Sequence, residues 1–457
     1  MKRTTLSSSK RHFSSAQIIP LGFLLLIAVG TGMLLLPSAT APGEQTSFLT
    51  ALFTATTSVC VTGLVVVDTF SHWSLFGKII ILILIQLGGL GVVAVSSSML
   101  LLFAKRFSIK NRVLLRDAFN LDSISDLMRF LLGVIKGVFC VEGIGALLYA
   151  FFFVPQFGFP RGLWYSVFHS VSAFCNAGLD ILGPDSLISY SGNPWLLIVT
   201  MLLIIIGGLG YIVWFDLSAA VHVLFQKGRS KPRLSEHSRL VLLLTAFLIL
   251  SGAGIVLLLE HDNPATLGSM PIGQKLLNSL FQSVTFRTAG FAAVPQNALR
   301  DPTALFGCLM MFIGGSPMGT AGGVKTVTVF VLFATALTYI HNRRETIVFR
   351  RRISGELIRK STAIVLITFS VSLLMTAALL CSDPLSMTDG LYEVFSATGT
   401  VGLSRGITAA LSPAGRWIII VGMYLGRIGP ISLALFFGVD DADKNEIQHA
   451  RGRFFVG

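Results

Sequence analysis

Four short segments of the chain share one pattern, in which a small or polar pair precedes a glycine, and they recur at nearly equal intervals. The segments are Val61-Thr62-Gly63, Asn176-Ala177-Gly178, Thr288-Ala289-Gly290 and Thr400-Val401-Gly402. Their glycines are separated by 115, 112 and 112 residues. A unit that recurs four times in one chain predicts fourfold pseudosymmetry, and four glycine loops around one axis are the layout of a pore.

The composition places such a pore in a membrane. The chain is 53% hydrophobic and 12% charged, with a mean hydropathy of +0.77, whereas about a quarter of the residues of soluble proteins are charged. Residues 18–37 form the first apolar segment, and residues 38–41 imitate a signal-peptide cleavage site. That segment is long enough to cross a ~30 Å hydrocarbon core, whereas the apolar part of a signal peptide has only ~7 to 15 residues. We therefore predict an uncleaved first helix in a multi-pass membrane protein.

The net charge of +13 comes mainly from alternate loops. Of the 35 Lys and Arg residues, 25 lie in the amino terminus, in residues 105–129, 227–239 and 343–360, and in the tail from Lys444 onward. Because positive charge collects on the cytoplasmic side of membrane proteins, both termini are predicted to be cytoplasmic. This distribution explains the basic composition better than nucleic-acid binding does, so we expect a lipid membrane and no nucleic acid as partner.

The same order of parts recurs four times: an apolar helix, a shorter half-apolar stretch, a glycine loop, a second apolar helix and a basic linker. It predicts an all-α membrane protein with eight transmembrane helices, arranged as four helix–pore loop–helix repeats around a central ion pore. The predicted parts are a cytoplasmic N-terminal segment (1–16), repeat 1 (17–126), repeat 2 (127–239), repeat 3 (240–360), repeat 4 (361–439) and a cytoplasmic tail (440–457).

The shorter stretches cannot cross a bilayer, which takes roughly 20 residues, so they are predicted to enter the membrane and return. Irregular backbone is tolerated at membrane depth only where it is buried in protein or lines a water-filled cavity. The four loops therefore predict one shared cavity. Polar side chains concentrate in them, namely Thr54, Thr56, Thr57, Ser58, Thr62, Ser170, Ser172, Asn176, Thr285, Thr288, Ser396, Thr398 and Thr400.

Glycine at the end of each loop predicts a filter built from backbone carbonyls. A dehydrated cation needs several carbonyl oxygens that point inward, and a residue without a Cβ atom permits the unusual backbone angles that this requires. All twelve residues of the four segments are therefore candidate ion-binding residues.

A second glycine motif recurs 24 to 29 residues after each loop glycine. Close packing of helices explains the copies at Gly88 and Gly207, so the second helix of repeat 2 is expected to continue over residues 194–225. The third copy is longer. It contains five glycines and a proline, which disfavour a helix, and it predicts an intramembrane loop over residues 314–325 beneath the filter. The candidate gating residues in it are Gly314, Gly315, Ser316, Pro317, Gly319, Thr320, Gly322, Gly323 and Lys325.

Two cationic residues at bilayer depth, Lys325 and Arg427, indicate control of the pore. Each costs roughly 2.5 to 3.5 kcal/mol at the centre of a spanning helix on insertion scales. A passive kink would not need the lysine, so we interpret residues 314–325 as a moving gate. Arg427 is expected to be a barrier or a latch that bonds to carbonyls of that loop; the alternative is a salt bridge to a buried acid.

Further charges lie near the filter. Arg287 directly precedes the third filter segment, where a free positive charge would oppose cation entry, so it is expected to be turned away and neutralised. Glu393 is the favoured structural partner, and Glu142 is the alternative. The acids Asp68 and Asp180 follow the first and second filter segments and are expected to concentrate cations at the mouth of the pore.

These motifs resemble the Ktr/Trk/HKT superfamily of potassium transporters over essentially the whole chain after residue 16. The most specific of them are Asn176-Ala177-Gly178, Arg287-Thr288-Ala289-Gly290, the loop 314–325 and Arg427 between Gly426 and Gly429. Eight spans without an additional amino-terminal pair are most similar to the Ktr-type membrane subunit. The resemblance implies potassium uptake, commonly sodium-dependent, with potassium bound by the backbone carbonyls of the filter. It also implies a homodimer on a cytosolic nucleotide-binding ring of the RCK type that moves the loop, in the cell membrane.

Two other classes remain open. A secondary cation carrier can also use broken helices, but carriers usually show inverted repeats. The potassium-binding subunit of an ATP-driven pump has comparable filters. The five cysteines and eight histidines show neither metal-ligand spacing nor a catalytic constellation. We therefore expect no enzyme and no cofactor in this chain, with potassium, and in some systems sodium, as the transported or coupling ion.

Overall fold

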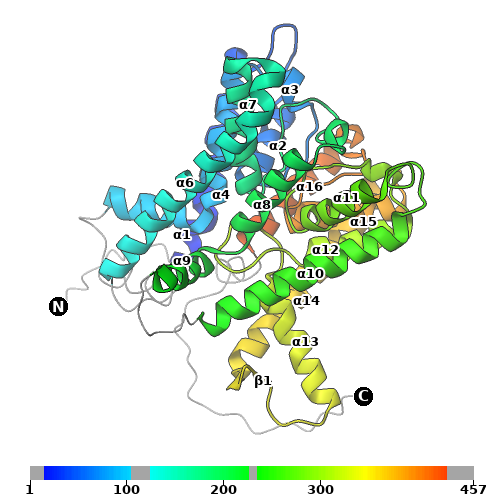
Figure 1. Ribbon diagram of the computed structural model, residues 1–457. Helices are drawn as coiled ribbons and strands as arrows, with labels where there is room; N and C mark the ends of the chain where they lie inside the picture. Colours follow the sequence, from blue (N-terminus) through cyan, green and yellow to red (C-terminus); the bar gives the residue numbers. More distant parts are fainter. Residues whose placement is uncertain (1–14, 104–123, 226–233, 430–457) are drawn as a thin grey trace, which may run out of the picture.

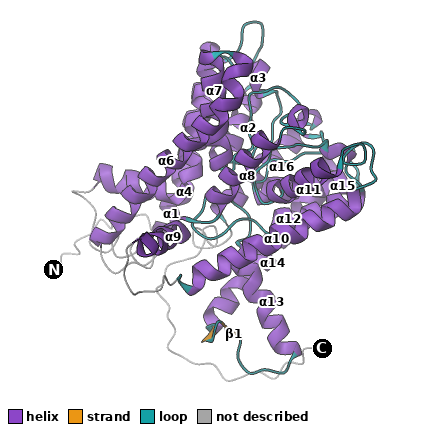
Figure 2. Cartoon of the chain, viewed as in Figure 1, coloured by secondary structure: helices purple, strands orange, loops and turns teal. Residues whose placement is uncertain are grey.

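The computed structural model describes residues 15–103, 124–225 and 234–429, and their regular secondary structure is almost entirely helical (Figures 1 and 2). The only strands among them, β1 (Ile347–Val348) and β2 (Arg351–Arg352), form a short antiparallel hairpin in which Ile347 pairs with Arg352. The predicted tail 440–457 lies outside the described residues, as does the predicted segment 1–16 apart from its last two residues.

The helices follow one another in four groups. The first contains α1 (Ser15–Leu34), α2 (Phe48–Val59), α3 (Thr69–His72) and α4 (Leu75–Phe103). The second contains α6 (Ile124–Phe157), α7 (Phe159–Phe174), α8 (Pro194–Gly208) and α9 (Tyr211–Phe225). The third contains α10 (Glu236–Glu260), α11 (Ile272–Thr285), α12 (Asp301–Phe312) and α13 (Thr326–Ile340). The fourth contains α14 (Gly355–Ser382), α15 (Met387–Gly399) and α16 (Pro413–Ile428).

Three helices of the described chain are long and apolar enough to cross a membrane by themselves, namely residues Arg129–Phe157 of α6, α10 and α14. A fourth apolar span consists of α8 and α9, which are bent by 103° at their junction. The expected continuous helix over residues 194–225 is therefore wrong. The chain breaks at Leu209 and Gly210, and Gly210 has φ of +90°, a left-handed conformation that glycine adopts at little cost.

Four short helices, α2, α7, α11 and α15, occupy the predicted half-apolar stretches and contain 12, 16, 14 and 13 residues. Serine caps begin two of them, because Ser47 Oγ accepts from the Thr50 amide at 3.1 Å and Ser386 Oγ accepts from the Asp389 amide at 3.1 Å. The helix α7 has no side-chain cap, but a proline in its first turn lacks the amide N–H that would otherwise be unpaired. Each helix packs against the long helix that precedes it, as α7 does against α6 in Figure 1.

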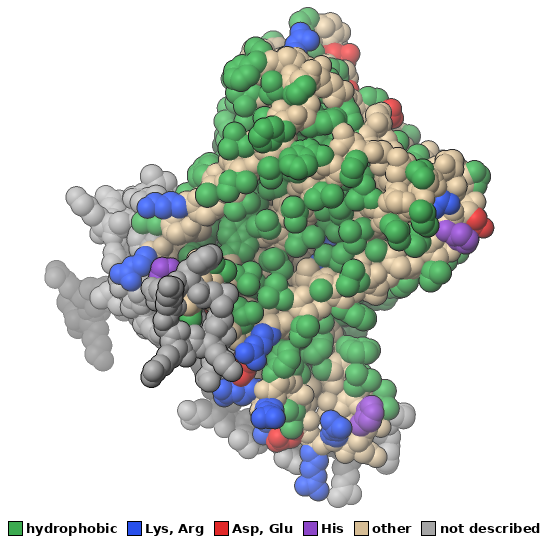
Figure 3. Space-filling view, viewed as in Figure 1, with side chains coloured by type: hydrophobic (Ala, Val, Ile, Leu, Met, Phe, Trp, Pro, Cys, Tyr) green, Lys and Arg blue, Asp and Glu red, His purple; other side chains and the backbone are tan. Residues whose placement is uncertain are grey.

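The surface agrees with a chain that lies in lipid. In the view of Figure 3, hydrophobic side chains cover the middle of the molecule, and many Lys and Arg side chains gather at the lower end, near α13 and β1. Leu250, Phe247 and Leu258 on α10 are each exposed by about two thirds or more. Large apolar side chains exposed over a whole helix face are typical of contact with lipid.

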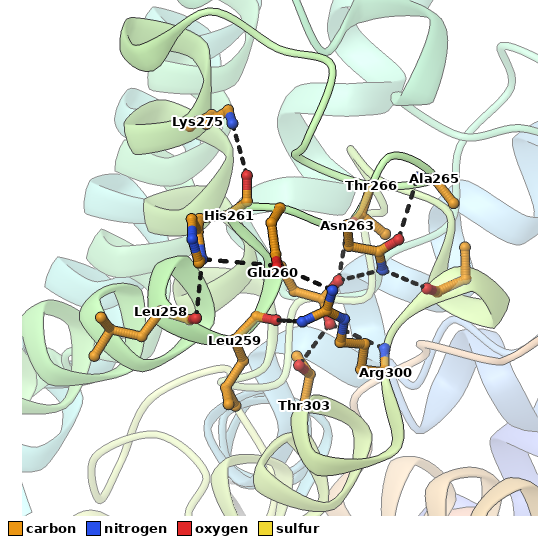
Figure 4. Close-up of polar contacts among 12 residues, drawn as sticks. Leu258, Leu259, Glu260, His261, Asn263, Ala265, Thr266, Lys275, Arg300 and Thr303 are labelled. Atoms are coloured by element: carbon orange, nitrogen blue, oxygen red, sulfur yellow. Dashed lines mark hydrogen bonds and ion pairs between the residues drawn. The ribbon is translucent and has the colours of Figure 1, made fainter.

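A buried carboxylate joins two helices of the third group. Glu260, at the end of α10, is fully buried and accepts four hydrogen bonds (Figure 4). Asn263 Nδ2 and Thr266 Oγ1 donate to one oxygen at 2.6 and 2.7 Å. The Arg300 amide and Thr303 Oγ1 donate to the other at 2.9 and 2.5 Å. The carboxylate thus fixes the start of α12 to the end of α10.

Replacement of this carboxylate is expected to destabilise the fold. In Glu260→Gln, one oxygen becomes an NH₂ group that faces two donors, so the free energy of unfolding should fall by about 2 kcal/mol, within the range for hydrogen bonds to charged groups. Thermal unfolding of the purified protein in detergent should show a midpoint several degrees lower. Glu345→Gln, at an exposed ion pair with Arg352, is the control and should leave the midpoint unchanged; equal midpoints in all three proteins would contradict the assignment.

Candidate functional site

The four predicted filter segments have the same backbone conformation. Each begins with a non-glycine residue in the left-handed region, and φ is +47° at Val61, +57° at Asn176, +67° at Thr288 and +50° at Thr400. Each then reaches its glycine with φ again positive, between +64° and +99°. For β-branched residues such as Val and Thr this conformation is rare and costly, and strained backbone of this kind is concentrated at functional sites.

The four glycines form a closed ring in the order of the chain. A Cβ atom added to Gly63 would lie 2.6 Å from the carbonyl oxygen of Ala177. A Cβ on Gly178 would lie 2.6 Å from the Ala289 oxygen, and one on Gly290 would lie 2.6 Å from the Val401 oxygen. A Cβ on Gly402 would overlap the Thr62 oxygen of the first segment, so the fourth segment closes the ring. Any side chain at these positions would therefore collide with the backbone of the next segment.

A hydroxyl group near the end of each short helix holds the filter segment that follows. Thr57 Oγ1 accepts from the Gly63 amide at 2.9 Å, and Ser396 Oγ accepts from the Gly402 amide at 3.0 Å. Ser172 Oγ and Thr285 Oγ1 instead donate to the carbonyl that follows their glycine, at 2.5 and 2.7 Å. All four hydroxyls belong to the polar set predicted to line the loops. The sequence did not reveal that they act as anchors.

Above the ring lies a cavity of about 350 Å³ that all four filter glycines help to line. Asp68 and Asp180, the two acids predicted at the mouth, line it as well. The Asp68 carboxylate caps α3 through the Phe70 and Ser71 amides at 3.2 and 3.0 Å. The Asp180 carboxylate accepts from the Leu182 amide at 3.2 Å. Both acids are therefore held in place beside the entrance to the ring.

The second glycine motif lets an inner helix pack closely on a short helix, as expected for the copies at Gly88 and Gly207. A Cβ on Gly88, Gly207 or Gly426 would overlap a backbone carbonyl oxygen four residues before the filter glycine, at Val59, Phe174 and Thr398 respectively. The inner helices α4, α8 and α16 thus pack directly on the ends of the short helices. In each case the helix then bends or ends, at Gly91 (φ +52°), after Gly208 and at Gly429 (φ +80°).

The third copy of this motif forms the longest interruption. No helix is present between Phe312 and Thr326, which covers the predicted loop 314–325. The loop closes on itself through the Gly314 amide and the Val324 oxygen at 2.9 Å, and Met318 adopts a positive φ of +59°. A Cβ on Gly322 would overlap the side chain of Thr400, so the loop lies directly against the fourth filter segment.

The loop is docked on the break between α8 and α9. The Ser316 amide donates to the Gly208 oxygen at 3.0 Å, and the Thr320 amide donates to the Gly207 oxygen at 3.1 Å. In the opposite direction, the Tyr211 amide donates to the Met318 oxygen at 3.0 Å. The broken helix of the second group thus supplies carbonyl and amide groups that a continuous helix would not expose.

The two cationic residues contact this loop. Lys325 Nζ donates to the Ala321 oxygen at 2.6 Å, within the loop itself. Arg427 on α16 donates from Nη1 to the Thr320 oxygen at 2.5 Å, and from Nη2 to the Gly89 oxygen of α4 at 3.2 Å. Its described partners, which also include the Gly88 oxygen, are all backbone carbonyls. This arrangement matches the expected bonding to loop carbonyls and not the alternative of a buried acid.

The expected pairing of Arg287 with Glu393 is wrong. Glu393 accepts hydrogen bonds from Ser404 Oγ at 2.7 Å and from Thr408 Oγ1. Arg287 is buried at 8% exposure, and its Nε atom has no hydrogen-bond partner. Arg287 lines a small cavity with Thr245, Ile249 and Gly315, and Glu393 is not among the lining residues. None of the ion pairs among the described residues includes Arg287, so the alternative partner Glu142 is wrong as well.

Comparison with known proteins identifies the family. The TrkH family model, described as cation transport protein, matches residues 15–447. This chain belongs to the TrkH family of cation transport proteins. The TrkH-family chain is 37% identical over 450 residues to Ktr system potassium uptake protein B of Bacillus subtilis, a match that covers 98% of this chain and 97% of that protein. It is 35% identical over 424 residues to potassium/sodium uptake protein NtpJ of Enterococcus hirae, covering 92% of each.

A solved structure shows the same fold. The potassium transporter TrkH from Vibrio parahaemolyticus superposes with a TM-score of 0.69 at 18% identity, over 94% of this chain and 86% of that chain. The resemblance to the Ktr and Trk proteins expected from the motifs is thus confirmed. Members of the family are ion transporters, so this TrkH-family chain is a multi-pass membrane transporter and not an enzyme.

Proposed function

We propose that this chain takes up potassium across the cell membrane through a channel-like pore, with the four glycine segments as its selectivity filter. The observation that carries the proposal is the closed ring, in which each filter glycine lies against the carbonyl of the next segment. Rings of backbone carbonyls replace the hydration shell of a cation. The relatives named above are potassium or potassium/sodium uptake proteins.

Unpaired hydroxyls support this role for the filter. The side-chain oxygens of Thr62, Thr288 and Thr400 are buried and have no hydrogen-bond partner. Buried polar atoms are nearly always paired, so oxygens left free at the ring are suited to a partially dehydrated cation. The proposed filter comprises all twelve residues of the four segments, with potassium held by their backbone carbonyls.

The loop 314–325 is proposed as the gate, with Lys325 and Arg427 as the groups that hold it. It lies against Thr400 of the filter, and it is fastened by single hydrogen bonds rather than by a helix. Such a segment can change position at a modest cost in free energy, because few contacts have to break. Eight spans in four pseudo-symmetric repeats, with both termini cytoplasmic, complete the proposed architecture.

The proposed partners are a second copy of the chain and a cytosolic nucleotide-binding ring of the RCK type. The basic hairpin β1–β2 and the ends of α13 and α14 lie at the end of the molecule where Lys and Arg gather, which is the proposed cytoplasmic side (Figure 3). Sodium dependence is proposed from the likeness to the Ktr proteins, and potassium uptake measured with and without external sodium tests it.

Rescue of a cell that lacks potassium uptake tests the proposed function. With a Ktr-type ring supplied, the chain should restore growth on limiting potassium. Absence of growth despite expression in the membrane would contradict the transport assignment. Co-purification with an ATPase subunit would favour the alternative of an ATP-driven pump, and a secondary carrier would require a coupling ion at every potassium concentration.

Uptake is expected to depend on external pH through Asp180. Burial, with a smaller contribution from the charge of Asp68, raises the pKa of Asp180 to about 7. Asp180 is therefore charged above that pH and loses its charge as the pH falls through it. One unit charge at roughly 8 Å in water contributes about 0.5 kcal/mol. The KM for external potassium should thus rise about two- to threefold between pH 8 and pH 6.

The variant Asp180→Asn isolates this effect. It should show the higher KM at both pH values, because it lacks the charge throughout. Asp262→Asn removes an external acid that pairs with Arg300 and should keep the pH dependence of the natural chain. A KM in Asp180→Asn that still changes with pH as in the natural chain would refute the role of Asp180.

A further inference from the structure

An apolar pocket opens between the first and second groups of helices, at a place that the filter and the gate do not use. Its volume is about 370 Å³, within the range of roughly 300–1,000 Å³ typical of small-molecule sites. Leu82, Phe139 and Val167 of α4, α6 and α7 line it. Phe139 and the neighbouring Ile83 are exposed by 58% and 51%. The pocket is therefore open on the lipid-facing surface.

A single carboxyl group lies in this apolar setting. Glu142 lines the pocket and is only 5% exposed. It stands one residue from the middle of the span Arg129–Phe157, so it lies near the centre of the bilayer. An acidic side chain at that depth is costly and is by default a sign of function.

This carboxylate has no cationic partner among the described residues. None of their ion pairs includes Glu142. Its one hydrogen bond comes from the thiol of Cys175 at 3.8 Å, which is long and weak. Gln86 approaches the carboxylate from α4, but its amide nitrogen forms no bond of normal hydrogen-bond geometry. The pocket thus offers a carboxyl group without a strong donor, beside an amide NH₂ group without an acceptor.

The far side of Glu142 adjoins the filter. Cys175 directly precedes Asn176, the first residue of the second filter segment. The Glu142 carbonyl also accepts from Ser170 Oγ at 2.6 Å, which ties α6 to the short helix α7. A molecule that neutralised Glu142 would therefore act within one residue of the ion path.

We propose that this pocket binds a lipophilic amine, whose ammonium group pairs with Glu142 and whose apolar chain occupies the space lined by Leu82, Phe139 and Val167. A cation without a chain would not reach a group near the bilayer centre. A chain without a cation would leave the carboxylate unpaired. A lipophilic amine provides both a cation for the carboxyl group and a chain for the apolar lining. It can enter from the lipid because the pocket opens there.

Photolabelling tests the proposal with the full chain in lipid nanodiscs. The probe is dodecylamine that carries a diazirine on its alkyl chain, and labelled positions are read by mass spectrometry. Labels should concentrate on residues 82–86, 139–146 and 167–171. Excess dodecylamine should reduce them at least fivefold, and dodecanol should not. Labels spread evenly over the lipid-facing helices, or equal protection by dodecanol, would overturn the proposal.

Two variants test the contribution of the carboxyl group and that of the apolar cavity separately. Glu142→Gln keeps the shape and should lose at least fivefold of the specific labelling. Ala146→Phe keeps the carboxylate but fills the pocket and should lose it as well. Glu356→Gln, at an exposed acid of α14, is the matched control and should label as the natural chain does. Unchanged labelling of Glu142→Gln would refute the site, whatever its transport activity.

An effect on uptake rests additionally on the proposed function. If the second filter segment carries ions, dodecylamine should lower rubidium uptake in the natural chain and not in Glu142→Gln. Specific labelling without an effect on uptake would support the binding site and would count against the filter role of Asn176. The failure of the site and the failure of the proposed function are thus distinguishable.

Discussion

Cells that depend on the Gly290→Ser variant are expected to lose at least tenfold of their preference for potassium over sodium and to fail to grow on limiting potassium. Gly290 has φ of +82°, and a Cβ atom there would lie 2.6 Å from the Val401 oxygen and 2.9 Å from Gly178 Cα. A left-handed conformation costs other residues roughly 1–2 kcal/mol, and the collision forces the ring apart. Potassium and sodium uptake in the same cells measure the change.

The matched control for this variant is Gly43→Ser. Gly43 has a similar φ of +90°, but nothing lies within 4 Å of a Cβ atom placed on it. It therefore shares the backbone strain and lacks the crowded ring. Growth and selectivity should be those of the natural chain. If Gly290→Ser kept full selectivity at normal expression, the four glycine segments would not be the filter.

Removal of the Arg427 side chain is expected to raise uptake about tenfold in the absence of a cytosolic partner. Its guanidinium joins the Thr320 oxygen of the loop to the Gly88 and Gly89 oxygens of α4. A hydrogen bond to a charged group contributes about 1.5–3 kcal/mol, and 1.4 kcal/mol corresponds to a tenfold change in a two-state population. The initial rate of rubidium uptake into proteoliposomes measures the effect of Arg427→Ala.

Arg427→Lys distinguishes a latch from an electrostatic barrier. Lysine keeps the charge but lacks the planar fork that reaches carbonyls on two elements at once. If Arg427 is a latch, the lysine variant should show raised uptake like the alanine variant. If the charge alone blocks the path, only the alanine variant should do so. Unchanged uptake in both variants would contradict any gating role for Arg427.

The sequence indicated that the four glycine segments need an unusual backbone, and their role as a filter stays a prediction. Only glycine can occupy the left-handed positions beside the next segment's carbonyl, as at Gly63 and Gly178. The short half-apolar stretches before them were predicted at residues 47–58, 162–174, 273–286 and 387–397, and the short helices lie within a few residues of these bounds. The gap in helix over residues 314–325 follows from its glycines and proline in the same way.

Other features depend on contacts between distant parts of the chain, and the sequence did not contain them. The glycines from Gly207 to Gly210 were interpreted as part of a continuous packed helix, yet α8 ends at Gly208, and the oxygens of Gly207 and Gly208 accept from amides of the loop. The pairing of Arg287 with Glu393 was inferred from the adjacency of two repeats, but Ser404 and Thr408 are nearer in the chain and already satisfy the carboxylate. Glu260, which accepts four hydrogen bonds, belongs to no sequence motif that would have predicted its role.

The proposed filter rests on the ring of carbonyls at Thr62, Ala177, Ala289 and Val401, each in contact with a glycine of the neighbouring segment. A pore of this kind transports without chemistry, because an inside-negative membrane potential contributes about 2.3 kcal/mol per 100 mV to the inward movement of one cation.

Rubidium flux through the purified chain tests the central claim most directly. Proteoliposomes with an inside-negative potential and external sodium should accumulate labelled rubidium, and external potassium should block this uptake at concentrations at which additional sodium does not. Uptake no greater than that of empty liposomes, or equal block by potassium and by additional sodium, would contradict a potassium-selective pore.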